Sequence, residues 1–337
     1  MAGRYVMPNG PIIHDGDVRT VLPTLDAESV QCVVTSPPYY GLRDYGVDGQ
    51  IGLEPTPDAY VETLVAVFRE VRRVLRDDGT AWLNLGDSYA SSPKGNPEAL
   101  SRGLTNLGRN AQRANQHRTR STVVGNLKPK DLVGIPWRVA FALQADGWYL
   151  RSDIVWAKGV SFCPAYSGSV MPESVTDRPT KSHEYVFLLT KSARYFYDAD
   201  AVREVGAGRD WSTSGGNMMG KGRIKGTVNG VASYHEIDRR GSAAASGRNL
   251  RSVWTINPHF ERHKPYREAH FATFPTALVE PCIKAGSKSG DLILDPFAGS
   301  GTVGCVALKL GREFVGIELN PDYSRMARES ILGRLFA

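Results

Sequence analysis

The chain has 337 residues, of which 41% are hydrophobic and 23% charged, with a formal net charge of +6. This length allows one large α/β domain with a smaller module, and no apolar run reaches the roughly 20 residues of a membrane span. The N-terminal residues lack the apolar centre of a signal peptide, so we expect a cytoplasmic protein.

The cysteines and histidines predict neither disulfide bonds nor a metal site. Cys32, Cys163, Cys282 and Cys305 are far apart in the sequence and form no C-x-x-C pair. This spacing argues against a disulfide framework and against structural zinc. We expect buried free thiols, and the seven histidines show no metal-ligand spacing.

The first half of the chain predicts strands and helices in alternation. Strands are expected at residues 11–13 and 30–34, followed by an amphipathic helix over residues 59–75. Asp77-Asp78-Gly79 is expected to end that helix, and residues 80–85 form the next strand. A helix over 136–144 and strands over 148–158 and 184–190 follow.

The second half continues the alternation. Residues 274–285, 301–310 and 322–335 predict helices, and residues 291–295 and 313–317 predict buried strands. Strands that alternate with helices indicate a mostly parallel sheet covered on both faces.

Two glycine-, serine- and asparagine-rich segments concentrate positive charge. Residues 92–130 hold eight Lys and Arg residues against one acidic residue, and residues 206–251 hold eight against three. Such loops suit a polyanionic partner. A solvated insertion without a partner is the alternative for either segment alone.

A glycine-rich turn follows the strand at 291–295. Residues Gly299 to Gly304 match G-x-G-x-x-G, and Glu318 ends the next strand at close to the usual spacing of ~20 residues. Glycines let the backbone approach a ligand, and a carboxylate after the second strand can bind ribose hydroxyls. The pattern predicts a ligand that contains adenosine.

The place of this turn late in the chain separates two folds. A conventional dinucleotide-binding domain needs at least one further strand after the final helix. We therefore expect the other strands to come from the N-terminal part, in a circularly permuted doubly wound sheet. Asp295 adds a carboxylate that a pyrophosphate does not need, whereas it suits a ligand with an ammonium and a sulfonium group.

A second turn, Ser36-Pro37-Pro38-Tyr39, directly follows the strand at 30–34. The two prolines fix φ and lack N–H donors, so the turn presents carbonyl acceptors and one hydroxyl in fixed positions. An exocyclic amino group that donates two hydrogen bonds to such acceptors becomes more nucleophilic. The Tyr39 ring offers a face for a base, worth roughly 1–3 kcal/mol. A plain proline turn is the alternative for these four residues alone.

Together the two turns resemble the amino-group DNA methyltransferases of the β arrangement, in which the catalytic motif precedes the specificity region and the cofactor motif comes last. The resemblance covers residues 35–39, 84–87, 182–198 and 270–320. It implies an α/β fold: a circularly permuted, doubly wound, mostly parallel seven-stranded Rossmann-like methyltransferase sheet with inserted basic DNA-recognition segments. The implied cofactor is S-adenosyl-L-methionine, and no metal is implied.

The resemblance also implies roles for individual residues. The catalytic residues would be Ser36, Pro37, Pro38 and Tyr39. The cofactor-binding residues would be Asp17, Phe271, Phe274, Asp295, Phe297, Gly299, Gly301, Thr302 and Glu318. In this scheme Glu318 holds the ribose hydroxyls, Asp17 lies near the adenine amino group, and residues 270–275 close over the cofactor carboxylate.

The implied layout has three parts. Residues 1–198 form the catalytic half with a DNA-facing loop at 92–130, residues 199–254 the target recognition region, and residues 255–337 the cofactor-binding half. The candidate DNA contacts are Arg43, Arg113, Arg118, Lys221, Arg223, Lys225, Arg239 and Arg240. The implied partner is double-stranded DNA, with a cognate restriction endonuclease as a candidate genetic partner and the protein a monomer or a homodimer. A cytoplasmic, nucleoid-associated protein of a bacterium or phage is expected.

Ser36 favours one substrate within this family. Serine at the first catalytic position is typical of N4-cytosine enzymes and aspartate of N6-adenine enzymes, and either base must be flipped out of the duplex. Adenine stays open as a substrate. An enzyme that uses the same cofactor on RNA or on a protein amide also stays open, as does a non-catalytic DNA-binding protein of this fold. The basic segments favour nucleic acid, and the presence of both turns favours catalysis.

Overall fold

The computed structural model describes residues 11–42, 44–90, 125–158, 175–204, 247–258 and 275–335. Contacts divide the chain into one unit of residues 1–197 and 252–337 and a second unit of residues 198–251. The predicted recognition region at 199–254 nearly coincides with the second unit, and its role stays a prediction. Ten predicted site residues lie outside the described residues: Phe271, Phe274, Arg43, Arg113, Arg118, Lys221, Arg223, Lys225, Arg239 and Arg240.

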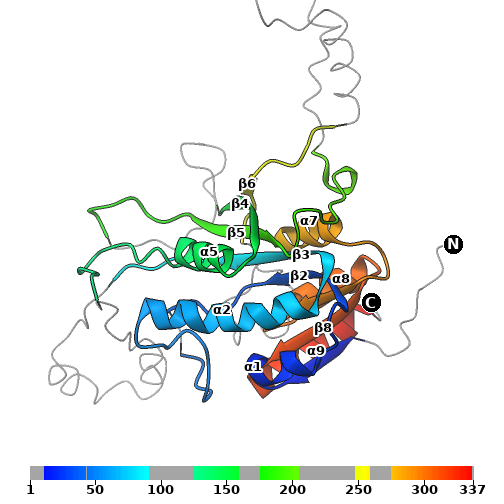
Figure 1. Ribbon diagram of the computed structural model, residues 1–337, viewed down its shortest axis with the longest axis horizontal. Coiled ribbons are helices and arrows are strands. Elements are labelled where there is room, and N and C mark those ends of the chain that lie inside the picture. The colour runs from blue at the N-terminus through cyan, green and yellow to red at the C-terminus, as the bar shows by residue number, and fades with distance from the viewer. Residues whose placement is uncertain are drawn as a thin grey trace, which may run out of the picture. The chain divides into compact units, whose positions relative to one another are not determined.

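An eight-stranded sheet forms the centre of the first unit (Figure 1). Its strands are β1 (Ile12–Asp15), β2 (Val30–Thr35), β3 (Leu75–Leu85), β4 (Tyr149–Ala157), β5 (His183–Thr190), β6 (Val253–Thr255), β7 (Leu292–Asp295) and β8 (Glu313–Glu318). Their order is β1-β8-β7-β2-β3-β5-β4-β6. The predicted number of seven strands was wrong, because β6 is a three-residue edge strand with too short a pattern to recognise.

The chain order confirms the permuted, mostly parallel sheet. The late strands β7 and β8 insert between β1 and β2, and all four are parallel. β2 and β3 are parallel, as are β4 and β6, whereas β5 is antiparallel to both its neighbours β3 and β4. The start of β5 therefore lies at the edge of the sheet where the other strands end. We call this the carboxyl edge.

Helices cover both faces of the sheet. The helices described in the first unit are α1 (Val18–Val21), α2 (Pro57–Val74), α5 (Ile135–Ala145), α7 (Thr276–Gly286), α8 (Thr302–Lys309) and α9 (Pro321–Leu335), with a short 3₁₀ turn at Leu22–Thr24. A second 3₁₀ turn, Asp200–Val202, lies in the other unit. Within the part of the chain that the structure describes, no helix is both long and apolar enough to cross a bilayer.

Side chains that point alternately to the two faces of β2 and β3 explain why helices cover both faces of the sheet. Val33 of β2 and Leu83 of β3 join the core cluster that contains the buried residues of α2 and α5. Their neighbours Cys32 and Trp82 point the other way, and both lie close to Gly286 at the end of α7. Figure 1 accordingly shows α2 and α5 on one side of the sheet and α7 on the other. Successive strand residues must face opposite layers, and both layers are apolar here.

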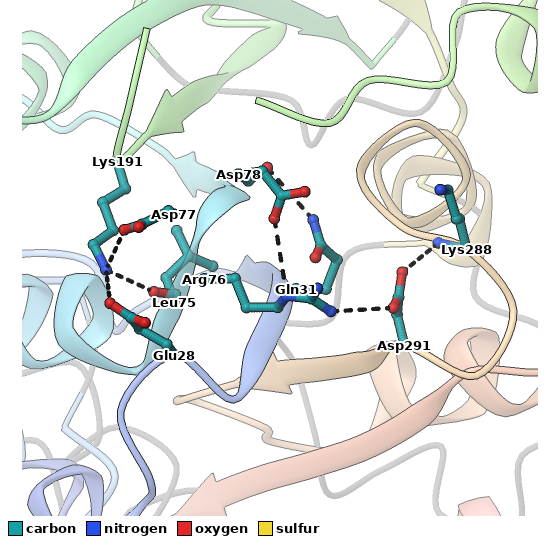
Figure 2. A network of polar contacts seen from close by, with 9 residues as sticks. All are labelled: Glu28, Gln31, Leu75, Arg76, Asp77, Asp78, Lys191, Lys288 and Asp291. Atoms are coloured by element: carbon teal, nitrogen blue, oxygen red, sulfur yellow. Dashed lines mark hydrogen bonds and ion pairs between the residues drawn. The ribbon is translucent and has the colours of Figure 1, made fainter. Parts of the chain in front are cut away.

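β3 begins at Leu75, five residues before the predicted strand start, so Asp77-Asp78-Gly79 lies inside a strand and does not end the helix. α2 ends at Val74, and residues 75–79 belong to β3, whose pairing with β2 shifts register between Val30 and Cys32. This bulge lies at the edge of the sheet opposite the carboxyl edge and is held by polar contacts (Figure 2). Lys191 Nζ lies 3.0 Å from Asp77 Oδ1, 3.3 Å from Glu28 Oε1 and 3.1 Å from the Leu75 carbonyl. Asp77 and Glu28 thus hold the first residues of β3 in place through Lys191.

The described cysteines agree with the thiol prediction. Cys32, Cys282 and Cys305 are buried, and Cys163 lies outside the described residues. Burial raises the pKa of the Cys32 thiol to about 12. Cys32 is therefore an inert core residue.

Candidate active site

A cavity of about 380 Å³ opens at the carboxyl edge of the sheet. Segments that follow β1, β2, β3, β4, β7 and β8 line it, together with the start of β5. Ten of the predicted site residues lie in its wall: Asp17, Ser36, Pro37, Pro38, Tyr39, Asp295, Phe297, Gly299, Thr302 and Glu318. The fold thus brings the two turns, far apart in sequence, to one cavity.

A buried hydrogen bond connects the two turns directly. The Thr35 hydroxyl, at the end of β2, donates to Asp295 Oδ1 at the end of β7 over 2.7 Å. The same oxygen accepts the Phe297 N–H over 3.0 Å, and Asp295 is only 2% exposed. Burial raises the pKa of Asp295 to about 7, although both hydrogen bonds oppose the shift.

Glu318 organises the glycine turn from the end of β8. Its carboxylate accepts the N–H groups of Gly299 and Asn320, each over 2.8 Å. Burial raises the pKa of Glu318, and these backbone hydrogen bonds counteract the rise. A carboxylate has about four acceptor positions, so Glu318 keeps acceptor capacity for ligand hydroxyls.

Gly301 lies between two cavity residues, Ser300 and Thr302, and does not itself line the cavity, so its cofactor role stays a prediction. It precedes α8 with a φ of +78°, in the left-handed region that favours glycine. A Cβ there would lie 3.1 Å from Cα and Cβ of Ala327 in α9. The structure therefore explains this glycine by backbone conformation and helix packing.

Asp17 lies in the cavity wall but is already engaged by Arg19. Its carboxylate accepts the Arg19 backbone N–H over 2.8 Å and faces the Arg19 guanidinium through both oxygens. Arg19 also donates to the Gly49 carbonyl over 2.8 Å. The hydrogen bonds from Arg19 hold the pKa of Asp17 below its usual value. Asp17 is thus a fixed anion.

The Ser-Pro-Pro-Tyr turn is held from both ends. Tyr60 of α2 donates its hydroxyl to the Pro38 carbonyl over 2.8 Å, so this carbonyl is engaged within the protein. The Tyr39 ring packs on the backbone of Gly86, where a Cβ would lie 2.5 Å from Tyr39 Cε2. One part of the ring that we expected to carry a base is therefore covered by the segment after β3.

The Tyr39 hydroxyl enters a polar cluster that the sequence did not reveal. It lies 2.7 Å from Glu184 Oε2 at the start of β5 and 3.0 Å from Asn84 Oδ1 at the end of β3. Glu184 also forms an ion pair with Lys158, which follows β4. Burial, and next the charge of Glu184, raise the pKa of Tyr39 well above its ordinary value.

Trp156 is a further cavity residue that sequence patterns did not single out. It is 3% exposed, and its Nε1 donates to the Ile256 carbonyl over 2.8 Å. Lys158 Nζ lies 4.9 Å from the centre of its ring, within cation–π range. Two signals were available: Trp156, Lys158 and Glu184 all lie at or beside strand ends, and Glu184 lies in the resembling segment 182–198.

Within the described residues, no group of three or more His, Cys, Asp or Glu side chains could hold a metal ion. The acidic residues of the cavity are instead spread along the sheet edge: Asp17 after β1, Glu184 at the start of β5, Asp295 at the end of β7 and Glu318 at the end of β8.

Comparisons with known proteins agree with this architecture. Residues 30–329 match the family model described as DNA methylase (N6_N4_Mtase). The chain is 46% identical over 327 residues to the type II methyltransferase M.Cfr9I of Citrobacter freundii, covering 96% of this chain and 89% of that protein. It is 44% identical over 322 residues to the type II methyltransferase M.SmaI of Serratia marcescens, covering 95% and 90%.

Solved structures share the fold. The PvuII DNA methyltransferase, described as cytosine-N4-specific, superposes with a TM-score of 0.60 at 18% identity, covering 96% of this chain and 91% of that one. TTHA0409 of Thermus thermophilus, a putative DNA modification methylase solved with S-adenosyl-L-methionine, gives a TM-score of 0.54 at 22% identity, covering 96% and 94%. The chain belongs to the DNA methylase family of amino-group methyltransferases, and its cofactor is S-adenosyl-L-methionine.

Proposed function

We propose that this protein transfers the methyl group of S-adenosyl-L-methionine to the exocyclic N4 amino group of a cytosine flipped out of double-stranded DNA. The observation that carries the proposal is the place of Ser36. Ser36 lines the same cavity as Asp295, Glu318 and the glycine turn. Two comparisons support this proposal. Relatives that are 44–47% identical to this chain are named type II methyltransferases, and the PvuII enzyme, which shares the fold, is described as cytosine-N4-specific.

The chemistry of the cavity fits the cofactor. The ligand carries a sulfonium and an ammonium group, and its half of the cavity contributes the carboxylates of Asp295 and Glu318. Asp295 would hold the ammonium, and the remaining acceptor positions of Glu318 would receive the ribose hydroxyls. Phe297 offers an apolar contact, and Asp17 would accept from the adenine amino group. Bound S-adenosyl-L-methionine supplies an electrophilic methyl group, so no enzyme nucleophile is required.

The Ser-Pro-Pro-Tyr turn would activate the target amino group. Because Tyr60 occupies the Pro38 carbonyl, Ser36 Oγ and the Pro37 carbonyl are the candidate acceptors for its two N–H groups. Two such hydrogen bonds draw the nitrogen toward tetrahedral geometry and direct its lone pair at the methyl group. This positioning is the main contribution of the turn.

The proposal of cytosine over adenine as the target base depends chiefly on Ser36. A serine hydroxyl is uncharged and can both accept and donate, whereas the aspartate of N6-adenine enzymes is an acceptor only. An N6-adenine DNA methyltransferase of the same fold is the second candidate, since the family model covers both. Action on RNA or on a protein amide is less well supported, because the curated relatives are type II methyltransferases.

The remaining expectations about DNA stay proposals. The basic segments would contact phosphates and offset the few kcal/mol that base flipping costs. We retain residues 199–254 as the candidate recognition region, a cognate restriction endonuclease as the candidate genetic partner, and a monomer or homodimer in the cytoplasm as the working form.

One experiment tests the proposal. Unmethylated bacterial genomic DNA is incubated with the protein and cofactor labelled in the methyl group, digested to nucleosides, and analysed by mass. Labelled N4-methylcytosine is expected. Labelled N6-methyladenine would replace the proposal with the second candidate, and unlabelled DNA would exclude both. Ser36→Ala is the matched variant, expected to bind the cofactor normally and to transfer methyl groups at least about 100-fold more slowly.

A further inference from the structure

The antiparallel strand β5 places a carboxylate next to the catalytic turn. Glu184 is the second residue of β5, and its side chain is only 13% exposed. Its Oε2 accepts from the Tyr39 hydroxyl over 2.7 Å, and Ser36 Oγ lies 3.4 Å from the same hydroxyl. Ser36, Tyr39 and Glu184 thus form a continuous chain of oxygens that ends at the cavity wall.

The anion at one end fixes the direction of every bond in this chain. An ionised carboxylate can only accept, and Glu184 Oε2 is nearer to the Tyr39 hydroxyl than Asn84 Oδ1 is, at 2.7 Å against 3.0 Å, so the single Tyr39 proton goes to Glu184. The Tyr39 oxygen is then available to accept from Ser36, in the direction Ser36 Oγ–H to Tyr39. The Ser36 oxygen is left with its lone pairs for a third group, and the wall position of Ser36 makes that group the target amine.

Two neighbours hold Glu184 in this arrangement. Asn84 Nδ2 donates to Glu184 Oε2 over 3.3 Å and to the Tyr185 carbonyl over 3.1 Å, which turns Asn84 Oδ1 toward Tyr39. Lys158 pairs with the other oxygen, Oε1, and is 25% exposed. An ion pair with added hydrogen bonds is the arrangement in which a charge is tolerated in a largely closed site.

We propose that Glu184 is a positioning residue that acts through Tyr39: it turns Ser36 Oγ toward the target amino group as an acceptor and receives the proton which that group releases. This inference rests on the proposed function and deepens it. It also accounts for Lys158, which would stabilise the ionised state of Glu184 between turnovers.

The proton balance of the transfer is complete within this chain. The amine lone pair forms the new N–C bond, the electron pair of the broken C–S bond stays on sulfur, and the nitrogen gains a positive charge. One N–H proton then passes to Ser36 Oγ, the Ser36 proton to the Tyr39 oxygen, and the Tyr39 proton to Glu184 Oε2. The amine becomes neutral, Glu184 becomes a carboxylic acid, and water takes up that proton when the cavity opens to solvent.

The test compares Glu184→Gln, Tyr39→Phe and the double variant with wild type in single turnovers. Each protein is preloaded with methyl-labelled S-adenosyl-L-methionine and mixed with unmethylated bacterial genomic DNA at several pH values. Glu184→Gln still accepts a hydrogen bond but cannot take up a proton. Glu280→Gln is the control, because Glu280 forms a comparable ion pair with Lys284 over 2.7 Å on α7 and does not line the cavity.

We expect Glu184→Gln and Tyr39→Phe each to slow methyl transfer by about 100-fold at pH 7, a typical contribution of a positioned proton acceptor. The double variant should be no slower than either single variant, because both break one chain. Transfer by Glu184→Gln should accelerate as pH rises, since solvent base replaces the carboxylate. Cofactor affinity, measured by calorimetry, should stay within about twofold of wild type, and Glu280→Gln should match wild type throughout.

Losses that multiply in the double variant, or a Glu184→Gln rate within threefold of wild type, would overturn the inference. Should Glu184→Gln not fold, Tyr39→Phe decides alone, because it keeps the ring against Gly86 and removes only the connecting hydroxyl. A wild-type rate for Tyr39→Phe overturns the inference. If wild type itself leaves DNA unlabelled, the proposed function fails and this inference with it, whereas labelled DNA with unaffected variants refutes the inference only.

Discussion

Thr35 donates its hydroxyl proton to Asp295 across 2.7 Å, although the two residues are 260 positions apart in the chain. Both are almost fully buried, at 1% and 2% exposure. They end the neighbouring parallel strands β2 and β7, so this bond joins the Ser-Pro-Pro-Tyr turn to the glycine turn. This bond therefore couples the turn that would activate the target amine to the carboxylate that would hold the cofactor ammonium.

Thr35→Val should separate this coupling from general stability. The substitution keeps the shape but leaves Asp295 with one hydrogen bond fewer, at a cost of about 1–3 kcal/mol in the free energy of unfolding. Weaker cofactor binding should accompany the loss. Denaturant unfolding and calorimetry measure the two effects. Thr63→Val is the control, because Thr63 bonds only the Ala59 carbonyl of its own helix α2. Equal behaviour of the two variants would contradict the coupling.

Cofactor binding should weaken as the solution is acidified through neutrality. With the pKa of Asp295 at about 7, the carboxyl is ionised above that pH and neutral below it, and only the ionised form attracts the ligand ammonium. Affinity should therefore fall by up to about tenfold for each pH unit below 7. Calorimetry from pH 5.5 to 8.5 checks this. Asp295→Asn should bind weakly at every pH, and an equally steep pH dependence in that variant would refute the assignment.

The same residue should make the free protein less stable as the pH rises from about 4 to 7. The folded pKa of about 7 exceeds the ordinary value of 3.8, so the folded state holds the proton more tightly. The resulting stability is complete below about pH 4 and is lost as pH rises through 7. Thermal unfolding of wild type and Asp295→Asn should thus differ in pH dependence across this window. Parallel curves would exclude a raised Asp295 pKa.

Gly301→Ala should act on stability through packing and backbone strain. Its φ of +78° disfavours alanine, and the new methyl group would lie 3.1 Å from Ala327. We expect a loss of about 2–3 kcal/mol in unfolding free energy. Gly290→Ala is the matched variant, with a φ of +86° and no atom within 4 Å of the added Cβ, and it should lose only about 1 kcal/mol. Indistinguishable losses would show that the contact with α9 is unimportant.

Gly86→Ala should impair catalysis more than binding. The added Cβ would lie 2.5 Å from Tyr39 Cε2 and must displace the ring from its place beside Glu184. A displacement of this size typically costs about 100-fold in rate. Single-turnover transfer and cofactor calorimetry together check this outcome. An unchanged rate would mean that the position of the Tyr39 ring is not critical.

The two turns could be predicted from the sequence because each directly follows a strand that its apolar residues identify, and the end of such a strand fixes where the turn lies. Short, mostly apolar segments such as Val30–Thr35 and Leu292–Asp295 identify buried strands, and the residues after them must lie at the carboxyl edge. The permuted order followed from where the glycine turn occurs in the chain. These inferences need no knowledge of which strands pair.

The Glu184 cluster could not be predicted for the opposite reason. Its place in the cavity depends on β5 running antiparallel to β3 and β4, and the apolar pattern of a strand contains no direction. Read as parallel, β5 would place Glu184 at the far edge of the sheet. Asp17 illustrates a related limit, because its pairing with Arg19 depends on the local turn at the start of α1.

The reversed strand β5 also has a consequence for how this scaffold can diversify. The described chain leaves the carboxyl edge after β3, β4 and β6, and it re-enters that edge at the start of β5. β5 ends at the opposite edge, and residues 191–252, which connect it to β6, hold most of the proposed recognition region; none of the described residues of this connection lines the cavity. Chimeras that carry this connection from a relative should therefore acquire a new DNA target while keeping the same methyl-transfer chemistry.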